Sequence, residues 1–404
     1  MSIIQKVKKI IIPIVIVVFL IVGTIIAVSY GKGYRFGFTN GRPDVSGTGL
    51  LVATSLPDGA QVFINDHLTT ATDNTINLFP GTYKVKIAKE GYFPWEKTLI
   101  IKKEVVTKAE ALLFPIAPKL ESITTTGVSN PVLDPSLIKI AYTVSSQSAT
   151  NKNGAYILDM SSRPILTLQG ASTQIVSDSI NSFSEAKLAW SPDGSQLIAT
   201  VSALSLETIY LLDPKGFNQT PSDITETMTT VINPSWQRQQ TERDNAQLNS
   251  LPSKVKKLVS DNFKILSWSY DETKILYLAV DDMILPTIIN PRMVGANSTP
   301  EQRDIKKDAV YVYDIKEDRN YKILDSLTDS ENPLAWFPDS KHLIFVHNQK
   351  VDIMEYDATN LTTVYAGPFE DRYVFSWPDG SKIVILTNLG NPTITPNLYT
   401  ISLK

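Results

Sequence analysis

The 404-residue chain has no cysteine and only three histidines, so few of its residues are suited to metal binding or nucleophilic catalysis. Without cysteine there are neither disulfides nor thiolate metal sites. His342 and His347 are five residues apart on one expected strand and point to opposite faces, whereas His67 stands alone. The signatures of zinc peptidases, serine hydrolases and P-loop nucleotide-binding proteins are missing as well. We therefore expect no enzyme, no catalytic, cofactor-binding or metal-binding residues, and no cofactor.

The chain also lacks an excess of positive charge outside its N-terminal region. Residues 1–46 carry six basic side chains and one acidic side chain, a net charge of +5, and the remainder carries −8. Nucleic acids and anionic wall polymers are recognised through basic surfaces. We expect neither as a partner.

One long apolar run is present near the N-terminus. Ile10 to Val28 is uncharged over 19 residues, and as a helix it would span about 28 Å, close to the roughly 30 Å of bilayer hydrocarbon. We predict a single-pass transmembrane helix at residues 10–28 after a cytosolic tail at residues 1–9. The small residues Ala27-Val28-Ser29 leave a cleaved signal peptide as the alternative, although the run is longer than a typical signal core.

Basic residues flank this run unequally. Lys6, Lys8, Lys9 and the N-terminal amine precede it, while Lys32 and Arg35 follow it. The positive-inside rule then places the N-terminus in the cytoplasm and the bulk of the chain outside the cell membrane. Residues 29–46 are rich in glycine and aromatic residues and are expected to form a flexible stalk. The alternative is that Phe36 and Phe38 begin a strand.

The sequence of residues 47–116 predicts a small β-sandwich. Pro57-Asp58-Gly59-Ala60 precedes a short strand, and Tyr83, Val85 and Ile87 alternate with lysines as in a half-buried strand. Further strands are expected at 49–55, 97–102 and 105–113. This region resembles the PEGA domain, with Asp58 in place of the name-giving Glu. The resemblance implies an envelope-associated adhesion or spacer module without enzymatic activity.

Residues 117–404 repeat one supersecondary unit five times: a tight turn, an apolar strand and a second strand that usually closes on Asp. The turn copies are Trp190-Ser-Pro-Asp193-Gly, Trp268-Ser-Tyr-Asp271, Trp336-Phe-Pro-Asp339, Trp377-Pro-Asp379-Gly and the weaker Asp134-Pro-Ser136. The tryptophans are expected to fill the gaps between neighbouring sheets, with sugar stacking as the less favoured role. Asp159, Asp213, Asp314 and Asp357 end the second strands, and turn capping is favoured for them over cation binding.

These turns resemble the blades of TolB-like or WD40-like β-propellers. The expected fold is therefore all-β: a transmembrane helix, a PEGA β-sandwich and a five-bladed propeller, with six blades as the alternative. Residues 119–126 are the candidate for the strand that closes the ring beside the last repeat. Two long insertions, at residues 217–261 and 281–308, are expected to be elaborations outside the core.

The resemblance implies binding more often than catalysis. We expect a membrane-anchored extracytoplasmic interaction or adhesion protein, held in the membrane by Ile10 to Val28, whose propeller binds a protein or glycan of the cell envelope. The alternative is an enzyme of lyase or lactonase type that works in the propeller channel.

Overall fold

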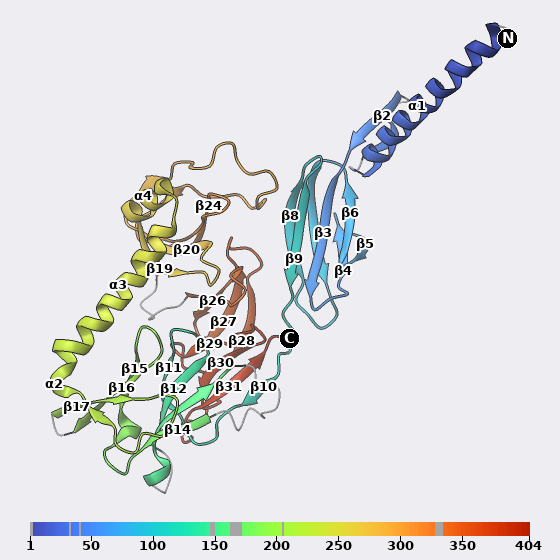
Figure 1. Ribbon diagram of the computed structural model, residues 1–404. Helices are drawn as coiled ribbons and strands as arrows, with labels where there is room; N and C mark the ends of the chain where they lie inside the picture. Colours follow the sequence, from blue (N-terminus) through green and yellow to red (C-terminus); the bar gives the residue numbers. More distant parts are fainter. Residues whose placement is uncertain are drawn as a thin grey trace. The chain divides into compact units, whose positions relative to one another are not determined.

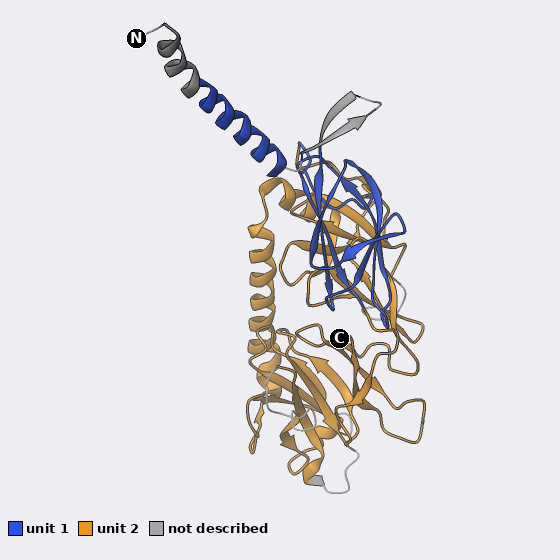
Figure 2. Cartoon of the chain, turned by 90° about the vertical axis from the view of Figure 1, so that its right-hand side faces the viewer, with its two compact units in different colours: residues 1–113, 291–300 blue, residues 114–290, 301–404 orange. Residues whose placement is uncertain are grey.

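The computed structural model describes residues 3–31, 34–39, 42–145, 150–161, 172–203, 206–327 and 334–404. These residues form two compact units, coloured separately in Figure 2. Unit 1 comprises residues 1–113 and 291–300, and unit 2 comprises residues 114–290 and 301–404. The segment 291–300 thus belongs to unit 1 although unit 2 surrounds it in the sequence.

Unit 1 begins with helix α1, Ile3–Gly31, at the blue end of Figure 1. It includes the predicted span and most of the predicted tail; the first two tail residues lie outside the described residues. Its segment Ile14–Gly31 is long and apolar enough to cross a membrane, and none of it is buried in the protein. The exposed side chains along it, such as Phe19, are those that water disfavours and lipid accepts.

The region expected as a flexible stalk is a β-hairpin instead. Strands β1 (Tyr34–Thr39) and β2 (Arg42–Gly47) pair antiparallel, with Phe36 opposite Val45 and Phe38 opposite Pro43. The alternative, a strand at Phe36 and Phe38, is confirmed. The glycine content predicted a flexible stalk, but the alternating aromatic residues in the same segment favour a strand.

The rest of unit 1 is a sandwich of two sheets. The first has the order β6-β3-β9 and the second β5-β4-β7-β8. Their strands are β3 (Gly49–Leu56), β4 (Gln61–Ile64), β5 (His67–Ala71), β6 (Asn74–Leu78), β7 (Gly81–Ala88), β8 (Trp95–Ile101) and β9 (Val106–Leu112). Alternate residues such as Val85 and Ile87 point into the shared core, as their spacing predicted.

Segment 291–300 lies against the edge of this sandwich. The backbone N–H of Ile100, in edge strand β8, donates to the Ser298 hydroxyl at 3.0 Å. Gly295 has a φ of +83°, and a Cβ there would lie 3.1 Å from Val105 Cγ1. The segment therefore satisfies one backbone donor of an edge that would otherwise attract other strands.

Unit 2 is built from four-stranded antiparallel sheets, five of them in the described residues, as the repeat predicted. In chain order of their first repeat strand, the sheets are β11-β12-β13-β14, β15-β16-β17-β18, β19-β20-β23-β24, β25-β26-β27-β28 and β10-β31-β30-β29. The strands of the first two sheets are β11 (Ser129–Leu133), β12 (Lys139–Val144), β13 (Gly154–Asp159), β14 (Ser172–Ser177), β15 (Lys187–Trp190), β16 (Leu197–Ala203), β17 (Leu206–Leu212) and β18 (Ser222–Asp223). Those of the third and fourth are β19 (Phe263–Trp268), β20 (Lys274–Ala279), β23 (Val310–Asp314), β24 (Arg319–Leu324), β25 (Leu334–Trp336), β26 (His342–His347), β27 (Lys350–Glu355) and β28 (Thr362–Ala366).

The last sheet joins the two ends of unit 2. It contains β10 (Leu120–Ser122), β29 (Val374–Ser376), β30 (Lys382–Thr387) and β31 (Asn397–Ser402), and Leu120 pairs with Ile401. The prediction that residues 119–126 supply a closing strand is confirmed. Without it, the C-terminal strand would be left as an open sheet edge.

The insertion at residues 217–261 is largely helical. It holds α2 (Thr225–Thr227), a π-helical turn (Met228–Ile232), α3 (Asn233–Ser250) and α4 (Ser253–Asn262). The second insertion carries a short ribbon of β21 (Met283–Ile284) and β22 (Asp304–Ile305). Among the described residues, 3₁₀ turns also lie at Thr150–Lys152 and Phe183–Glu185.

The expectation that both insertions lie outside the core is wrong. Val255 and Val259 of α4 are buried in one cluster with Tyr277 and Tyr311 of the third sheet, and Leu285 and Ile305 from the second insertion are buried there too. The sheet has a large aromatic face, and these insertions remove it from water.

Candidate functional site

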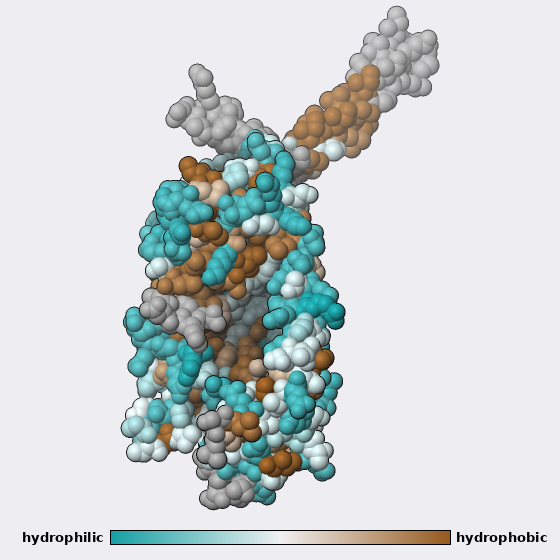
Figure 3. All heavy atoms as spheres, turned by 90° about the vertical axis from the view of Figure 1, so that its left-hand side faces the viewer, coloured by the Kyte–Doolittle hydropathy of each residue, from teal (hydrophilic) through white to brown (hydrophobic). Residues whose placement is uncertain are grey.

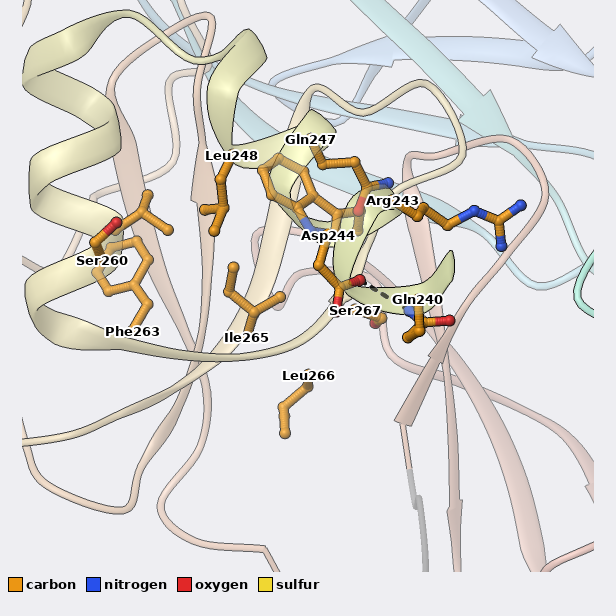
Figure 4. Close-up of a pocket in the computed structure, with 12 residues that line it drawn as sticks. Gln240, Arg243, Asp244, Gln247, Leu248, Ser260, Phe263, Ile265, Leu266 and Ser267 are labelled. Atoms are coloured by element: carbon orange, nitrogen blue, oxygen red, sulfur yellow. Dashed lines mark hydrogen bonds between the residues drawn. The ribbon is translucent and has the colours of Figure 1, made fainter. Parts of the chain in front are cut away.

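A groove of about 630 Å³ lies between helix α3 and strand β19 in unit 2 (Figure 4). The volume is in the range of sites that hold small molecules or short peptide segments. The α3 side of the protein faces the viewer in Figure 3, where hydrophobic surface borders a hollow. The groove has a polar lining from α3 and an apolar lining from α4 and β19.

Helix α3 contributes the polar wall of the groove. Gln240, Arg243, Asp244 and Gln247 follow the spacing i, i+3, i+4, i+7, which places them on one face of the helix. Gln240 donates to Asp244 at 2.8 Å within this face. The wall presents one guanidinium and one carboxylate, so its two charges balance.

Two contacts hold α3 to the turns of neighbouring repeats. The Arg243 guanidinium donates to the backbone carbonyl of Pro192 at 3.1 Å, and the Gln247 amide donates to the Glu272 carboxylate at 2.9 Å. Pro192 lies in the turn after β15 and Glu272 in the turn after β19. One turn of α3 thus bridges equivalent turns of the second and third sheets.

The apolar floor comes from the end of α4 and from β19. Val259 is fully buried and Phe263 nearly so, and the Phe263 ring stacks on Tyr277 with centroids 3.5 Å apart. Leu248 and Ile265 pack partly buried against the same cluster. Close packing beneath the groove makes this floor rigid.

Strand β19 is irregular where it borders the groove. Ile265 pairs with Tyr277 and Ser267 with Leu276, so Leu266 is a bulged residue without a partner in β20. The Leu266 side chain is 37% exposed, an unusual state for a large apolar group in a sheet. The Ser267 hydroxyl is buried and has no hydrogen-bond partner in the described part of the chain. Bulges of this kind commonly redirect side chains beside binding sites.

The repeat tryptophans divide into two groups. Trp190 is buried and donates to the Val132 carbonyl of the neighbouring sheet at 3.1 Å, and Trp336 is buried between the third and fourth sheets. Both confirm the gap-filling role predicted from the sequence. Trp377 is partly buried against the core shared by the first and last sheets. Trp268 differs, because it is half-buried and lines the groove.

The carboxylates that end the second strands cap turns. Each accepts a backbone N–H two or three residues further on: Asp159 from Ser161, Asp213 from Lys215, Asp314 from Glu317 and Asp357 from Thr359. The predicted capping role is confirmed. Among the described residues, no cluster of three or more His, Asp or Glu could hold a metal ion.

The repeat turns are fixed in the same way. Gly194 donates to the Ser191 carbonyl at 2.9 Å, and the Ser191 hydroxyl donates to the Asp193 carboxylate at 2.6 Å. Hydrogen bonds from the Ser191 hydroxyl and then from Ser195 lower the pKa of Asp193 to about 2. The carboxylate is a structural acceptor in its ionised form.

The histidines are likewise held apart. His342 Nδ1 lies 2.6 Å from Asp339, and His347 Nε2 lies 2.8 Å from Asp352. The two rings occupy opposite ends of β26. His67 begins β5 in unit 1. The structure therefore does not bring His342 and His347 together.

Three comparisons with known proteins bear on this architecture. Residues 48–115 match the family model described as the PEGA domain. The search of curated proteins finds no match. Similar solved structures include a TolB structure from Agrobacterium tumefaciens, 14% identical with a TM-score of 0.22, which covers 68% of this chain and 72% of that one. Another is TolB from Acinetobacter baumannii, 15% identical with a TM-score of 0.24, which covers 80% of this chain and 60% of that one. The chain thus has an N-terminal apolar helix and a PEGA domain at residues 48–115, and its second unit contains four-stranded antiparallel sheets.

Proposed function

We propose that this protein is a membrane-anchored extracytoplasmic binding protein. In this proposal α1 is the anchor, the PEGA domain is a spacer or adhesion module, and unit 2 is a five-bladed propeller that binds a protein or glycan of the cell envelope. The observation that carries the proposal is the groove between α3 and β19. Its rigid floor, the exposed Leu266 and the Ser267 hydroxyl, which has no hydrogen-bond partner among the described residues, are features of a preformed binding site.

Several observations support the individual parts. The five four-stranded sheets in the described residues of unit 2 support five blades, with six blades as the alternative. The exposed apolar segment Ile14–Gly31 supports an anchor, with a cleaved signal peptide as the alternative. The turn-capping roles of the repeat carboxylates favour binding over catalysis.

Binding in the groove is tested by filling the groove with a larger side chain. The full-length protein in lipid nanodiscs is screened against a library of linear peptides and an array of envelope glycans. Gln240→Trp should abolish binding of the selected ligands, because the ring would fill the groove, whereas Gln239→Trp should not. Both positions are exposed on α3, but only Gln240 lines the groove. Absence of any ligand, or equal binding by both variants, would contradict the proposal.

Membrane orientation is tested by thiol labelling. The chain has no native cysteine, so Lys215→Cys, at an exposed turn, introduces a single reactive site. A membrane-impermeant maleimide applied to intact cells should label it, while Lys6→Cys should react only after lysis. The reverse pattern would place unit 2 in the cytoplasm.

A further inference from the structure

We propose that one end of the unit 1 sandwich lies on the surface of the bilayer that holds α1. The contact surface comprises Lys102, Lys103, Met293 and Val294, and it is called the lipid-facing end below. This inference rests on the anchoring role of α1 proposed above and is independent of the groove in unit 2. It follows from the short chain between α1 and β1, from the contacts of Tyr34, and from the exposure and charge of the four residues.

The sandwich begins close to the point where the chain leaves the membrane. The apolar segment Ile14–Gly31 ends three residues before Tyr34, the first residue of β1. Three residues span at most about 11 Å, and the headgroup layer is roughly 5–8 Å thick on each side of the hydrocarbon. Tyr30, near the end of α1, is exposed, as aromatic residues at a membrane interface are. Tyr34 therefore lies within the headgroup layer or just above it.

Tyr34 contacts the turn between β8 and β9. Its hydroxyl donates to the Glu104 carboxylate, and the Lys103 ammonium lies 4.7 Å from the centre of its ring. These contacts hold the turn at the level of Tyr34. The Lys102 and Lys103 side chains are exposed there. The turn thus presents two ammonium groups beside the membrane.

Segment 291–300 adds apolar side chains at the same end. A Cβ at Gly295 would lie 3.1 Å from Val105 Cγ1 and 3.4 Å from the carbonyl oxygen of the first residue of β9. The segment therefore passes directly beside the β8–β9 turn, and it forms one compact unit with the sandwich (Figure 2). Met293 and Val294, which precede Gly295, are 47% and 68% exposed.

This combination fits a lipid surface. One exposed apolar side chain is common in proteins, but two adjacent ones beside lysines and a membrane anchor match an interfacial site. The apolar side chains can enter the boundary between headgroups and acyl chains, while the ammonium groups stay at the phosphates. Lys32 and Arg35, in the same short stretch of sequence as Tyr34, add positive charge. Anionic headgroups are therefore the favoured contact.

The experiment measures how close the lipid-facing end comes to the headgroups. The chain has no native cysteine, so Val294→Cys carries a single bimane label in the full-length protein. The nanodiscs contain phosphatidylcholine and phosphatidylglycerol, with a fraction of the lipid carrying a nitroxide on its headgroup. Bimane fluorescence should fall by about twofold or more relative to nanodiscs without nitroxide, because the label would lie in the headgroup layer.

Glu90→Cys with the same label is the matched control. Gly81 pairs with Ile101 and Ile87 with Trp95, so the exposed turn that holds Glu90 lies at the opposite end of the sheet. The seven residues of β8 separate the two ends by roughly 20 Å. This label should keep its fluorescence in the presence of the nitroxide.

Two further variants test the chemistry of the contact. In the Val294→Cys protein, Met293→Asp should restore the fluorescence, because a carboxylate is repelled by anionic headgroups, whereas Met293→Leu should leave it quenched. Lys102→Gln should lower the ratio of membrane-bound to free lipid-facing ends about fivefold in nanodiscs with phosphatidylglycerol and leave it unchanged in phosphatidylcholine alone. All three substitutions are at exposed positions, so the fold is retained.

The outcomes separate this inference from the anchor. Protein that does not co-elute with the nanodisc would refute the anchor and the lipid-facing end together. Protein that stays in the nanodisc, with Val294→Cys quenched no more than Glu90→Cys, would overturn the lipid-facing end and leave the anchor standing. Quenching that is unchanged by Met293→Asp and by Lys102→Gln would overturn it as well. Selective quenching at Val294→Cys that both substitutions weaken would support it.

Discussion

The buried ion pair between Arg303 and Asp318 should contribute measurably to the stability of unit 2. The Asp318 side chain is 0% exposed and that of Arg303 is 12% exposed, and Arg303 Nη2 lies 2.9 Å from Asp318 Oδ1. The Tyr313 hydroxyl donates to Oδ1 at 2.8 Å. The backbone N–H groups of Ile288 and Ile289 donate to Oδ2 at 2.7 and 2.9 Å. One carboxylate thus fastens the second insertion to the third sheet.

Asp318→Asn should lower the free energy of unfolding of unit 2 by about 2–3 kcal/mol, because it removes the charged acceptor of the hydrogen bonds from Arg303, Tyr313, Ile288 and Ile289, while Glu301 stays 3.0 Å from Arg303 Nε as its remaining partner. The substitution changes the charge with little backbone strain, since residue 318 has a φ of 51° and asparagine tolerates this region. Urea unfolding of the full-length protein in detergent, followed by tryptophan fluorescence, measures the difference. Asp325→Asn, in the exposed pair with Lys322, should cost less than about 1 kcal/mol.

The effect should also depend on pH. Burial alone would raise the pKa of Asp318, but hydrogen bonds from Ile289, Arg303, Tyr313 and Ile288 lower it below its ordinary value. Such a group contributes its stability above the unfolded pKa of about 3.9 and loses it as the pH falls through the lower folded pKa. The gap between wild type and Asp318→Asn should therefore be constant near neutrality and shrink below about pH 4. A gap no larger than that of Asp325→Asn, or one that widens in acid, would refute this account.

Three further changes test other parts of the fold. Val255→Ala should lower the free energy of unfolding by about 2 kcal/mol in the same urea assay, because the side chain is buried in the core of the third sheet. A loss under about 0.5 kcal/mol would mean that α4 does not contribute to this core. Gly154→Ala should lower the free energy of unfolding by at least about 2 kcal/mol, since residue 154 has a φ of +138° and the new Cβ would lie 2.1 Å from the Val176 carbonyl oxygen. Unchanged stability would exclude this close approach. Ser298→Ala should speed hydrogen exchange at the Ile100 amide about tenfold, and Ser298→Thr, which keeps the hydroxyl, should not; equal exchange in both would remove the contact.

The repeats were predictable because their turns are specified by local chemistry. Ser191, Asp193 and Gly194 each meet a requirement of the turn itself, so the residues that define it stand next to one another in the sequence. The closing strand was predictable for a different reason. Strand β31 pairs with β30 on one side, and Leu120 of β10 pairs on its other side, as the pattern of the repeats predicted.

The burial of α4 was missed although its signal was present. Leu251, Val255, Leu258 and Val259 recur at intervals of four, three and one residues, which is an apolar stripe along one helix face. The lysines around them and the long spacing between the repeats indicated a polar insertion instead. Periodicity within the insertion was a better guide to burial than its composition.

The groove itself had no comparable signal. Helix α3 is polar on all sides, so no pattern distinguishes the face with Gln240 and Asp244 from the others. The bulge at Leu266 depends on how β19 meets β20, which residue order alone does not specify. The groove depends on tertiary contacts among α3, α4 and β19, and none of these segments shows a sequence pattern for it.

Helix α3 shows why such a site can be rigid without an apolar helix face. A helix with this composition has little reason to pack by itself, because most helical stability in proteins comes from burying one apolar side. It is held instead through Arg243 at Pro192 and through Gln247 at Glu272, two repeat turns of neighbouring sheets. Those turns are fixed by their own hydrogen bonds, so their contacts with Arg243 and Gln247 determine the position of the helix. The width of the groove is thereby set by contacts within unit 2 itself.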